Sequence, residues 1–182
     1  MNPPEKKQRS VLGVVGALWG VLGLLALLGR SVIGLAPMAL EPFGMELQWW
    51  HWVAYVGSVI FMAYSEGYKG FQKGFSPRVI RRGIYLAAHP TLLRVLLAPA
   101  FCMGLFHASK KRLIVSWSVS LGVFALVMLV RSVAQPWRGI IDAGVVVGLS
   151  WGTVAIVVFA VQALVGNAPQ GAIDLPGEKS GA

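Results

Sequence analysis

Two carboxylates lie beside long apolar segments of this 182-residue chain. Glu66 ends one such segment and Asp142 begins another. A charged side chain at membrane depth is costly, and it is usually paired or used to move a proton or ion. If the chain crosses the membrane five times, Arg94, Arg131 and Arg138 lie at the same membrane face as the two carboxylates, near them. This set therefore predicts either structural ion pairs that fix helix register or a proton relay.

The run SEGYKGFQKGFSPRVIRR, residues 65–82, concentrates positive charge. It holds five of the chain's sixteen cationic residues, namely Lys69, Lys73, Arg78, Arg81 and Arg82. Ser76 followed by Pro77 is typical of a helix start. We expect a short amphipathic helix on the cytoplasmic leaflet, with its cations contacting anionic lipid or a partner protein. The alternative is a plain loop that obeys the positive-inside rule.

Histidine and cysteine give little support for a metal centre. In a five-helix threading, His51 and His107 both lie near the outer interface, where two imidazoles are weak candidates for haem ligation. His89 precedes Pro90 and is expected to end the amphipathic helix. Cys102 is the single cysteine, so it cannot form an intramolecular disulfide. We predict no metal and no cofactor.

Sequence motifs of enzymes are missing. The chain contains no HExxH, GxSxG or Walker sequence and no paired-aspartate motif of lipid transferases. Its few intramembrane polar groups are mostly arginines, whereas catalytic sites usually cluster at least three reactive groups. Enzymatic activity is therefore not favoured.

Glycines recur at helical spacing in the first and last apolar segments. Such faces let helices approach closely, either within one bundle or between two copies of the chain; we favour packing within the bundle. The glycines are Gly13, Gly16, Gly20, Gly23, Gly144, Gly148 and Gly152.

Composition indicates the class of protein that carries these residues. The chain is 56% hydrophobic and 13% charged, with a mean hydropathy of +0.68, as expected of an integral membrane protein. Its net charge of +9 is attributed to loops that face anionic lipid, and not to nucleic-acid binding.

The hydropathy pattern predicts an all-α bundle of five transmembrane helices and a short cytoplasmic amphipathic helix. Four spans are clear, and the third either crosses or re-enters because Arg94 and Pro99 interrupt it. A basic N-terminus (1–10) precedes the bundle (11–165), and a flexible polar tail (166–182) follows it. The expected spans are residues 11–29, 48–64, 92–107, 113–130 and 140–165.

The positive-inside rule leaves the number of crossings open. Five crossings place eleven of the sixteen cations inside, and four crossings place thirteen there. Hydropathy favours five crossings, which puts Lys110, Lys111 and Arg112 outside. In both threadings the N-terminus is cytoplasmic.

The function predicted from these features is that of a small structural or accessory protein of the inner (plasma) membrane. It would contact anionic lipid or a membrane partner through residues 67–89, as a monomer or as a homo-oligomer. Two other classes stay open: an oligomeric proton-coupled transporter that uses Glu66 and Asp142, and a haem- or quinone-binding redox protein that uses His51 and His107.

Overall fold

The computed structural model describes residues 10–176, and every regular element in that range is a helix. The all-α prediction is therefore confirmed. Three of the helices in this range are long and apolar enough to cross a membrane: residues Val11–Gly44, Lys110–Arg131 and Trp137–Leu164. The elements are α1 (Val11–Leu40), the 3-10 helix η1 (Glu41–Gly44), α2 (Trp49–Met62), the π-helix η2 (Ala63–Phe75), α3 (Ser76–Ala88), α4 (Leu92–Leu96), α5 (Ala98–Met103), α6 (Lys110–Arg131) and α7 (Trp137–Leu164).

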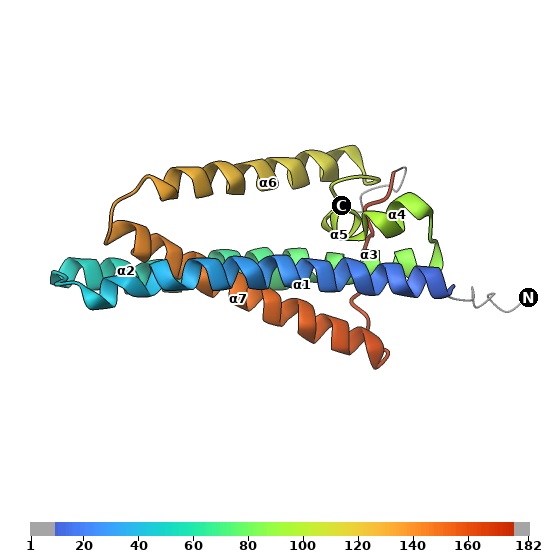
Figure 1. Cartoon of the computed structure of the whole chain (residues 1–182). Coiled ribbons are helices and arrows are strands. Elements are labelled where there is room, and N and C mark those ends of the chain that lie inside the picture. The colour runs from blue at the N-terminus through green and yellow to red at the C-terminus, as the bar shows by residue number, and fades with distance from the viewer. Residues whose placement is uncertain (1–9, 177–182) are drawn as a thin grey trace, which may run out of the picture.

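The long elements run back and forth between two ends of the bundle (Figure 1). Helix α1 runs from the first end to the second. Elements α2, η2 and α3 follow one another without a break and lead back to the first end. Helices α4 and α5 stay at the first end, α6 runs away from it, and α7 comes back. We call the end that holds the start of α1 together with α3, α4 and α5 the basic end.

Helix α3 is part of the core. It follows η2 without a break, and the amide of Ser76 donates to the carbonyl of Phe71, five residues earlier, as in a π-helix. The side chains of Val79 and Leu86 are 0% exposed. The separate amphipathic helix expected after Ser76 and Pro77 is not confirmed, because this segment packs against α1, α5 and α7.

The third apolar segment does not form a spanning helix. It is divided between α4 and α5, which are five and six residues long. Eleven helical residues extend about 17 Å, well short of a hydrocarbon core of about 30 Å. Pro99 lies in the first turn of α5, and Gly104, at φ 78°, ends that helix in the left-handed conformation that glycine adopts readily. A third crossing is therefore not confirmed, and the segment is a broken one at the basic end.

The broken segment exposes carbonyl groups that no helix can satisfy, and side chains from other elements bond to them. The donors come from α1, α3 and α6, so three helices hold this segment in place. The bonds are Trp19 Nε1 to Leu96 O (3.3 Å), Arg82 Nε to Phe101 O (2.6 Å), Ser116 Oγ to Met103 O (3.2 Å) and Trp117 Nε1 to Leu105 O (3.0 Å).

Helix α6 stands apart from the bundle along most of its length (Figure 1). Its two buried residues, Ser116 and Val130, lie toward its two ends. A methyl group added at Gly122, near its middle, would meet nothing within 4 Å. The middle of α6 therefore has room for lipid chains on every side.

The two glycine faces meet other elements of the same chain. A Cβ atom at any of the seven glycines would lie within 3 Å of a neighbouring residue. The α1 face meets the segment from α3 to α5, and the α7 face meets α2 and η2. The nearest neighbours are Ala87, Val95, Cys102 and Pro99 for Gly13, Gly16, Gly20 and Gly23, and Ser58, Glu66 and Phe71 for Gly144, Gly148 and Gly152.

Candidate anion-binding site

Arg82 is buried at the basic end, with 3% of its surface exposed. Beyond its bond to Phe101, its guanidinium donates to the carbonyls of Phe106 (3.2 Å), His107 (3.1 Å) and Ile173 (2.9 Å). Its Cζ also lies 4.2 Å from the centre of the Phe101 ring. The expectation that Arg82 contacts lipid headgroups is corrected, because all three of its nitrogens are used inside the fold.

Three further arginines surround Arg82, namely Arg78 and Arg81 on α3 and Arg112 on α6. Among residues 10–176, no carboxylate oxygen lies within 4 Å of their nitrogens. The Nε atoms of Arg78 and Arg81 are buried and have no hydrogen-bond partner. This arginine cluster therefore holds positive charge that makes no ion pair within the described chain and is offset only partly by Asp174.

A pocket of about 250 Å³ lies at the edge of the arginine cluster. Basic side chains dominate its lining, and Asp174 of the C-terminal segment is its one acidic residue. The lining residues are Arg78, Ser109, Lys111, Arg112, Val115 and Asp174. Ser109 caps α6, since its Oγ accepts from the amide of Arg112 at 3.4 Å. The positive end of the α6 dipole therefore also faces the pocket.

Arg78 is buried beside a second cation, Arg112. Burial, reinforced by neighbouring Arg112, lowers the pKa of Arg78 to about 10, and Asp174 opposes this change. Arg78 therefore stays cationic near neutral pH, and an anion between it and Arg112 would relieve the repulsion.

The C-terminal segment covers this site. The carbonyl of Gln170 accepts from Arg81 Nη1 at 2.6 Å, and the carbonyl of Asp174 accepts from the amide of Ser109 at 2.8 Å. Residues 166–176, predicted as part of a flexible tail, therefore lie against α3 and the start of α6. The basic residues expected at 1–9, and residues 177–182, lie outside the described range.

Lys69 and Lys73 lie apart from the arginine cluster, on η2. Their Nζ atoms sit over the rings of Tyr64 (4.8 Å) and Tyr68 (4.5 Å). Both lysines are exposed. Five cations were expected to contact lipid, and these two are accessible for that contact.

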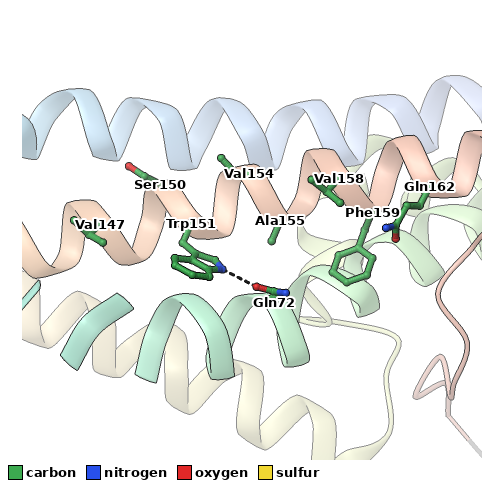
Figure 2. A pocket seen from close by; sticks show the side chains of 9 residues that line it. All are labelled: Gln72, Val147, Ser150, Trp151, Val154, Ala155, Val158, Phe159 and Gln162. Atoms are coloured by element: carbon green, nitrogen blue, oxygen red, sulfur yellow. Dashed lines mark hydrogen bonds between the residues drawn. The ribbon is translucent and has the colours of Figure 1, made fainter. Parts of the chain in front are cut away.

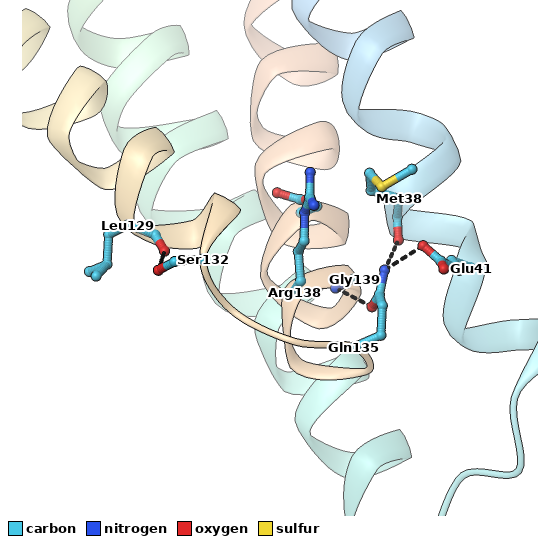
Figure 3. A network of polar contacts seen from close by, with 8 residues as sticks. Met38, Glu41, Leu129, Ser132, Gln135, Arg138 and Gly139 are labelled. Carbon is cyan, nitrogen blue, oxygen red and sulfur yellow. Dashed lines mark hydrogen bonds and ion pairs between the residues drawn. The ribbon is translucent and has the colours of Figure 1, made fainter.

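The predicted group of carboxylates and arginines is divided between different parts of the bundle. At the end opposite the basic end, Arg138 Nε lies 3.6 Å from Asp142 Oδ2, in an ion pair along α7. Gln135 lies beside this pair, donating to Glu41 Oε2 (2.7 Å) and accepting from the amide of Gly139 (2.9 Å) (Figure 3).

The other predicted members of this group do not join that ion pair. Arg131 ends α6 and is exposed. Arg94 is at the basic end, where it bonds to the carbonyl of His89 (3.2 Å) and to His107 Nε2 (2.6 Å). Glu66 packs against Gly148, near the middle of α7.

The two histidines proposed as haem ligands cannot share one iron. His51 is in the first turn of α2, at the end opposite the basic end, and its ring lies 5.3 Å from that of Trp137. His107 lies between α5 and α6 at the basic end, bonded to Arg94. The bis-histidine hypothesis is therefore wrong, because the bundle separates the two rings.

A second pocket, of about 620 Å³, was not expected from the sequence. It opens between η2 and α7 and is mainly apolar (Figure 2). The indole nitrogen of Trp151 donates to Gln72 Oε1 at 2.8 Å at its edge. The spacing of Trp151, Val154 and Val158 along one helix face is the only sequence signal that points to this surface.

Comparison with protein families, curated proteins and solved structures finds no match to this chain. The functional argument therefore depends on the geometry of the sites.

Proposed function

We propose that this protein is a small structural or accessory protein of the inner (plasma) membrane that binds an anionic phospholipid through its basic end. One observation carries the proposal. Arg78, Lys111 and Arg112 surround a pocket in which the only carboxylate, Asp174, lies more than 4 Å from the arginine nitrogens.

A phosphate group suits this pocket better than a carboxylate does. A guanidinium presents parallel N–H donors that match phosphate oxygens, and Arg78 and Arg112 bring two of them together. The start of α6 adds the positive end of its helix dipole, which favours a bound phosphate.

The surroundings of α6 favour a lipid over a soluble phosphate. The pocket lies at the start of α6, and farther along that helix the space beside Gly122 is open. A headgroup held by Arg112 would therefore leave its acyl chains beside an apolar helix. Lipid chains would also cover the exposed apolar side chains of α6, such as Leu121 and Phe124.

The same proposal includes a topology of four crossings with the N-terminus in the cytoplasm. Helices α1, α6 and α7 supply three crossings. The continuous α2 and η2, with 14 and 13 residues, supply the fourth. Lys69 and Lys73 lie within η2, and Arg30, Arg131 and Arg138 lie toward the outer side. The remaining eleven of the sixteen cations then lie on the cytoplasmic side.

Lipid binding can be tested by native mass spectrometry of the purified protein with phosphatidylglycerol and with phosphatidylcholine. The double variant Arg78→Gln/Arg112→Gln should bind phosphatidylglycerol about thirty-fold more weakly, since each cation contributes about 1 kcal/mol. Neither guanidinium donates a hydrogen bond within residues 10–176, so the variant should fold.

The control variant, Lys69→Gln/Lys73→Gln, removes the same charge outside the pocket and should retain most of the affinity. Equal weakening in both variants would contradict the pocket and indicate attraction by overall charge. Saturation of the site by millimolar inorganic phosphate alone would contradict the lipid assignment. A protein that copurifies in stoichiometric amount and is lost only from the arginine variant would favour a partner instead.

The topology is tested by cysteine labelling. Lys110→Cys should react with an impermeant maleimide only after cell lysis, whereas Glu46→Cys, in the loop at the other end, should react in intact spheroplasts. Labelling of Lys110→Cys in intact spheroplasts would refute four crossings and restore five.

A further inference from the structure

Glu66 is a carboxyl group without a partner inside the bundle. Its Oε2 atom is buried and has no hydrogen-bond partner. The only ion pair among residues 10–176 is that of Arg138 and Asp142, so no cationic nitrogen lies within 4 Å of Glu66. Glu66 is half-buried as a residue, but a carboxylate here would lack the hydrogen bonds and the counter-charge that normally stabilise it.

The depth of Glu66 in the membrane follows from its contact with α7. Gly148 is the twelfth residue of a 28-residue helix, and a Cβ atom there would lie 2.6 Å from Glu66 Oε2. At 1.5 Å per residue, this contact is about 17 Å from the start of α7 and about 24 Å from its end. Glu66 is therefore near the middle of a helix that crosses the membrane, and not at an interface.

The surroundings of Glu66 exclude a neighbouring base or counter-ion. Lys69 and Lys73, on its own element, lie over tyrosine rings. The elements packed against η2 are α2, α3 and α7. Their titratable groups are His51 and Tyr55 on α2, Arg78, Arg81, Arg82 and Tyr85 on α3, and Arg138 and Asp142 on α7. None of these groups makes a hydrogen bond or an ion pair with Glu66.

Glycine residues create the space that Glu66 occupies. Gly148 leaves room for its carboxyl group, and neighbouring Gly67 lets the Trp151 side chain lie against the helix backbone. The indole N–H of Trp151 donates to Gln72 (Figure 2), so it is not a donor to the carboxylate. Glu66 lies on the π-helix η2, and its side chain contacts α7 at Gly148.

We propose that Glu66 is a proton-binding site within the membrane, held as a neutral carboxylic acid against Gly148. The ligand of this site is a proton, taken up to neutralise a charge that the bundle cannot otherwise stabilise. Loss of the proton would place a bare carboxylate between η2 and α7, so protonation is coupled to the contact between these helices. The proposal is independent of lipid binding at the basic end.

The test is modification by dicyclohexylcarbodiimide in liposomes. This apolar reagent needs the acid form, because it takes up the carboxyl proton before the carboxylate oxygen adds to its central carbon. Peptide mapping should find the adduct on Glu66 and lose it in Glu66→Gln. The yield should fall as the pH is raised, as the acid form is depleted.

Asp142 is the internal control, because Arg138 supplies it with the counter-charge that Glu66 lacks, so it should stay unmodified. The variant Lys69→Gln tests whether a lysine neutralises Glu66 in the membrane. An adduct on Glu66 that appears only in Lys69→Gln would overturn the proposal.

A second measurement covers the case in which the reagent cannot reach the site. If Glu66 is neutral, Glu66→Gln replaces it with a neutral side chain of the same shape and should leave thermal stability unchanged. The infrared carbonyl band of a protonated carboxylic acid should disappear in the same variant. A band that is already missing in the wild type would refute the proposal.

Discussion

The contact between Gly152 and Phe71 offers a sharp test of how α7 packs. A Cβ atom at Gly152 would lie 2.5 Å from both Cγ and Cδ1 of Phe71. Ordinary contact begins near 3.4 Å, so Gly152→Ala requires the ring and the helix to separate by about 0.9 Å. The ring cannot simply rotate away, because Cγ is fixed one bond from Cβ and Phe75 packs against the ring at 5.5 Å.

We expect Gly152→Ala to lower the free energy of unfolding by about 1 to 3 kcal/mol through overpacking. The controls are Gly57→Ala on α2 and Gly122→Ala on α6, because a methyl group at either site meets nothing within 4 Å. These control substitutions should leave the free energy of unfolding unchanged or raise it by up to about 1 kcal/mol, because alanine has a higher helix propensity than glycine. The assay is reversible unfolding in mixed micelles with increasing SDS. Equal stability of all three variants would show that α7 and η2 do not touch through this face.

Three further predictions concern the basic end. Arg82→Lys should destabilise the fold by about 2 to 4 kcal/mol in the same assay, because an ammonium cannot reach four carbonyls, whereas Lys69→Gln should change little. Burial and then Arg94 lower the pKa of His107 below its ordinary 6.5, so the native state binds fewer protons than the unfolded chain. Stability should therefore fall as the pH drops below about 6.5, and His107→Gln should flatten this slope in thermal melts. Burial raises the pKa of the Cys102 thiol to about 12. Maleimide at neutral pH should therefore label Cys102 only after denaturation. Rapid labelling of the native protein would instead place α5 at the surface.

Periodicity and hydropathy predict the long helices well. The apolar runs that begin at Val11 and Leu113 became α1 and α6 because each has enough apolar residues to cross a bilayer without interruption. The glycine spacing likewise marked the faces of α1 and α7 that meet neighbouring elements. These features are local, so the sequence pattern is sufficient to find them.

The sequence could not predict which cations face inward. Arg78, Arg81 and Arg82 share one helical stripe, and a stripe of cations normally faces water or lipid headgroups. In the structure Arg82 is 3% exposed, whereas Arg78 and Arg81 are only partly covered. Arg82 faces inward because backbone carbonyl groups of α5 and the C-terminal segment accept its hydrogen bonds. These carbonyl groups are distant in sequence, and backbone groups leave no pattern in the sequence of side chains.

Arg82 explains why a chain this apolar can contain a broken helix at its basic end. Non-helical backbone near membrane depth is stable only when its polar groups are bonded within the protein. Pro99 and Gly104 interrupt the segment, and the carbonyls of Phe101, Phe106 and His107 that this interruption exposes all accept from the Arg82 guanidinium. A lysine or a water molecule would satisfy fewer of them. Arg82 therefore acts as part of the fold, whereas the guanidinium groups of its neighbours Arg78 and Arg112 make no such bonds, which is why the proposed anion site is placed there.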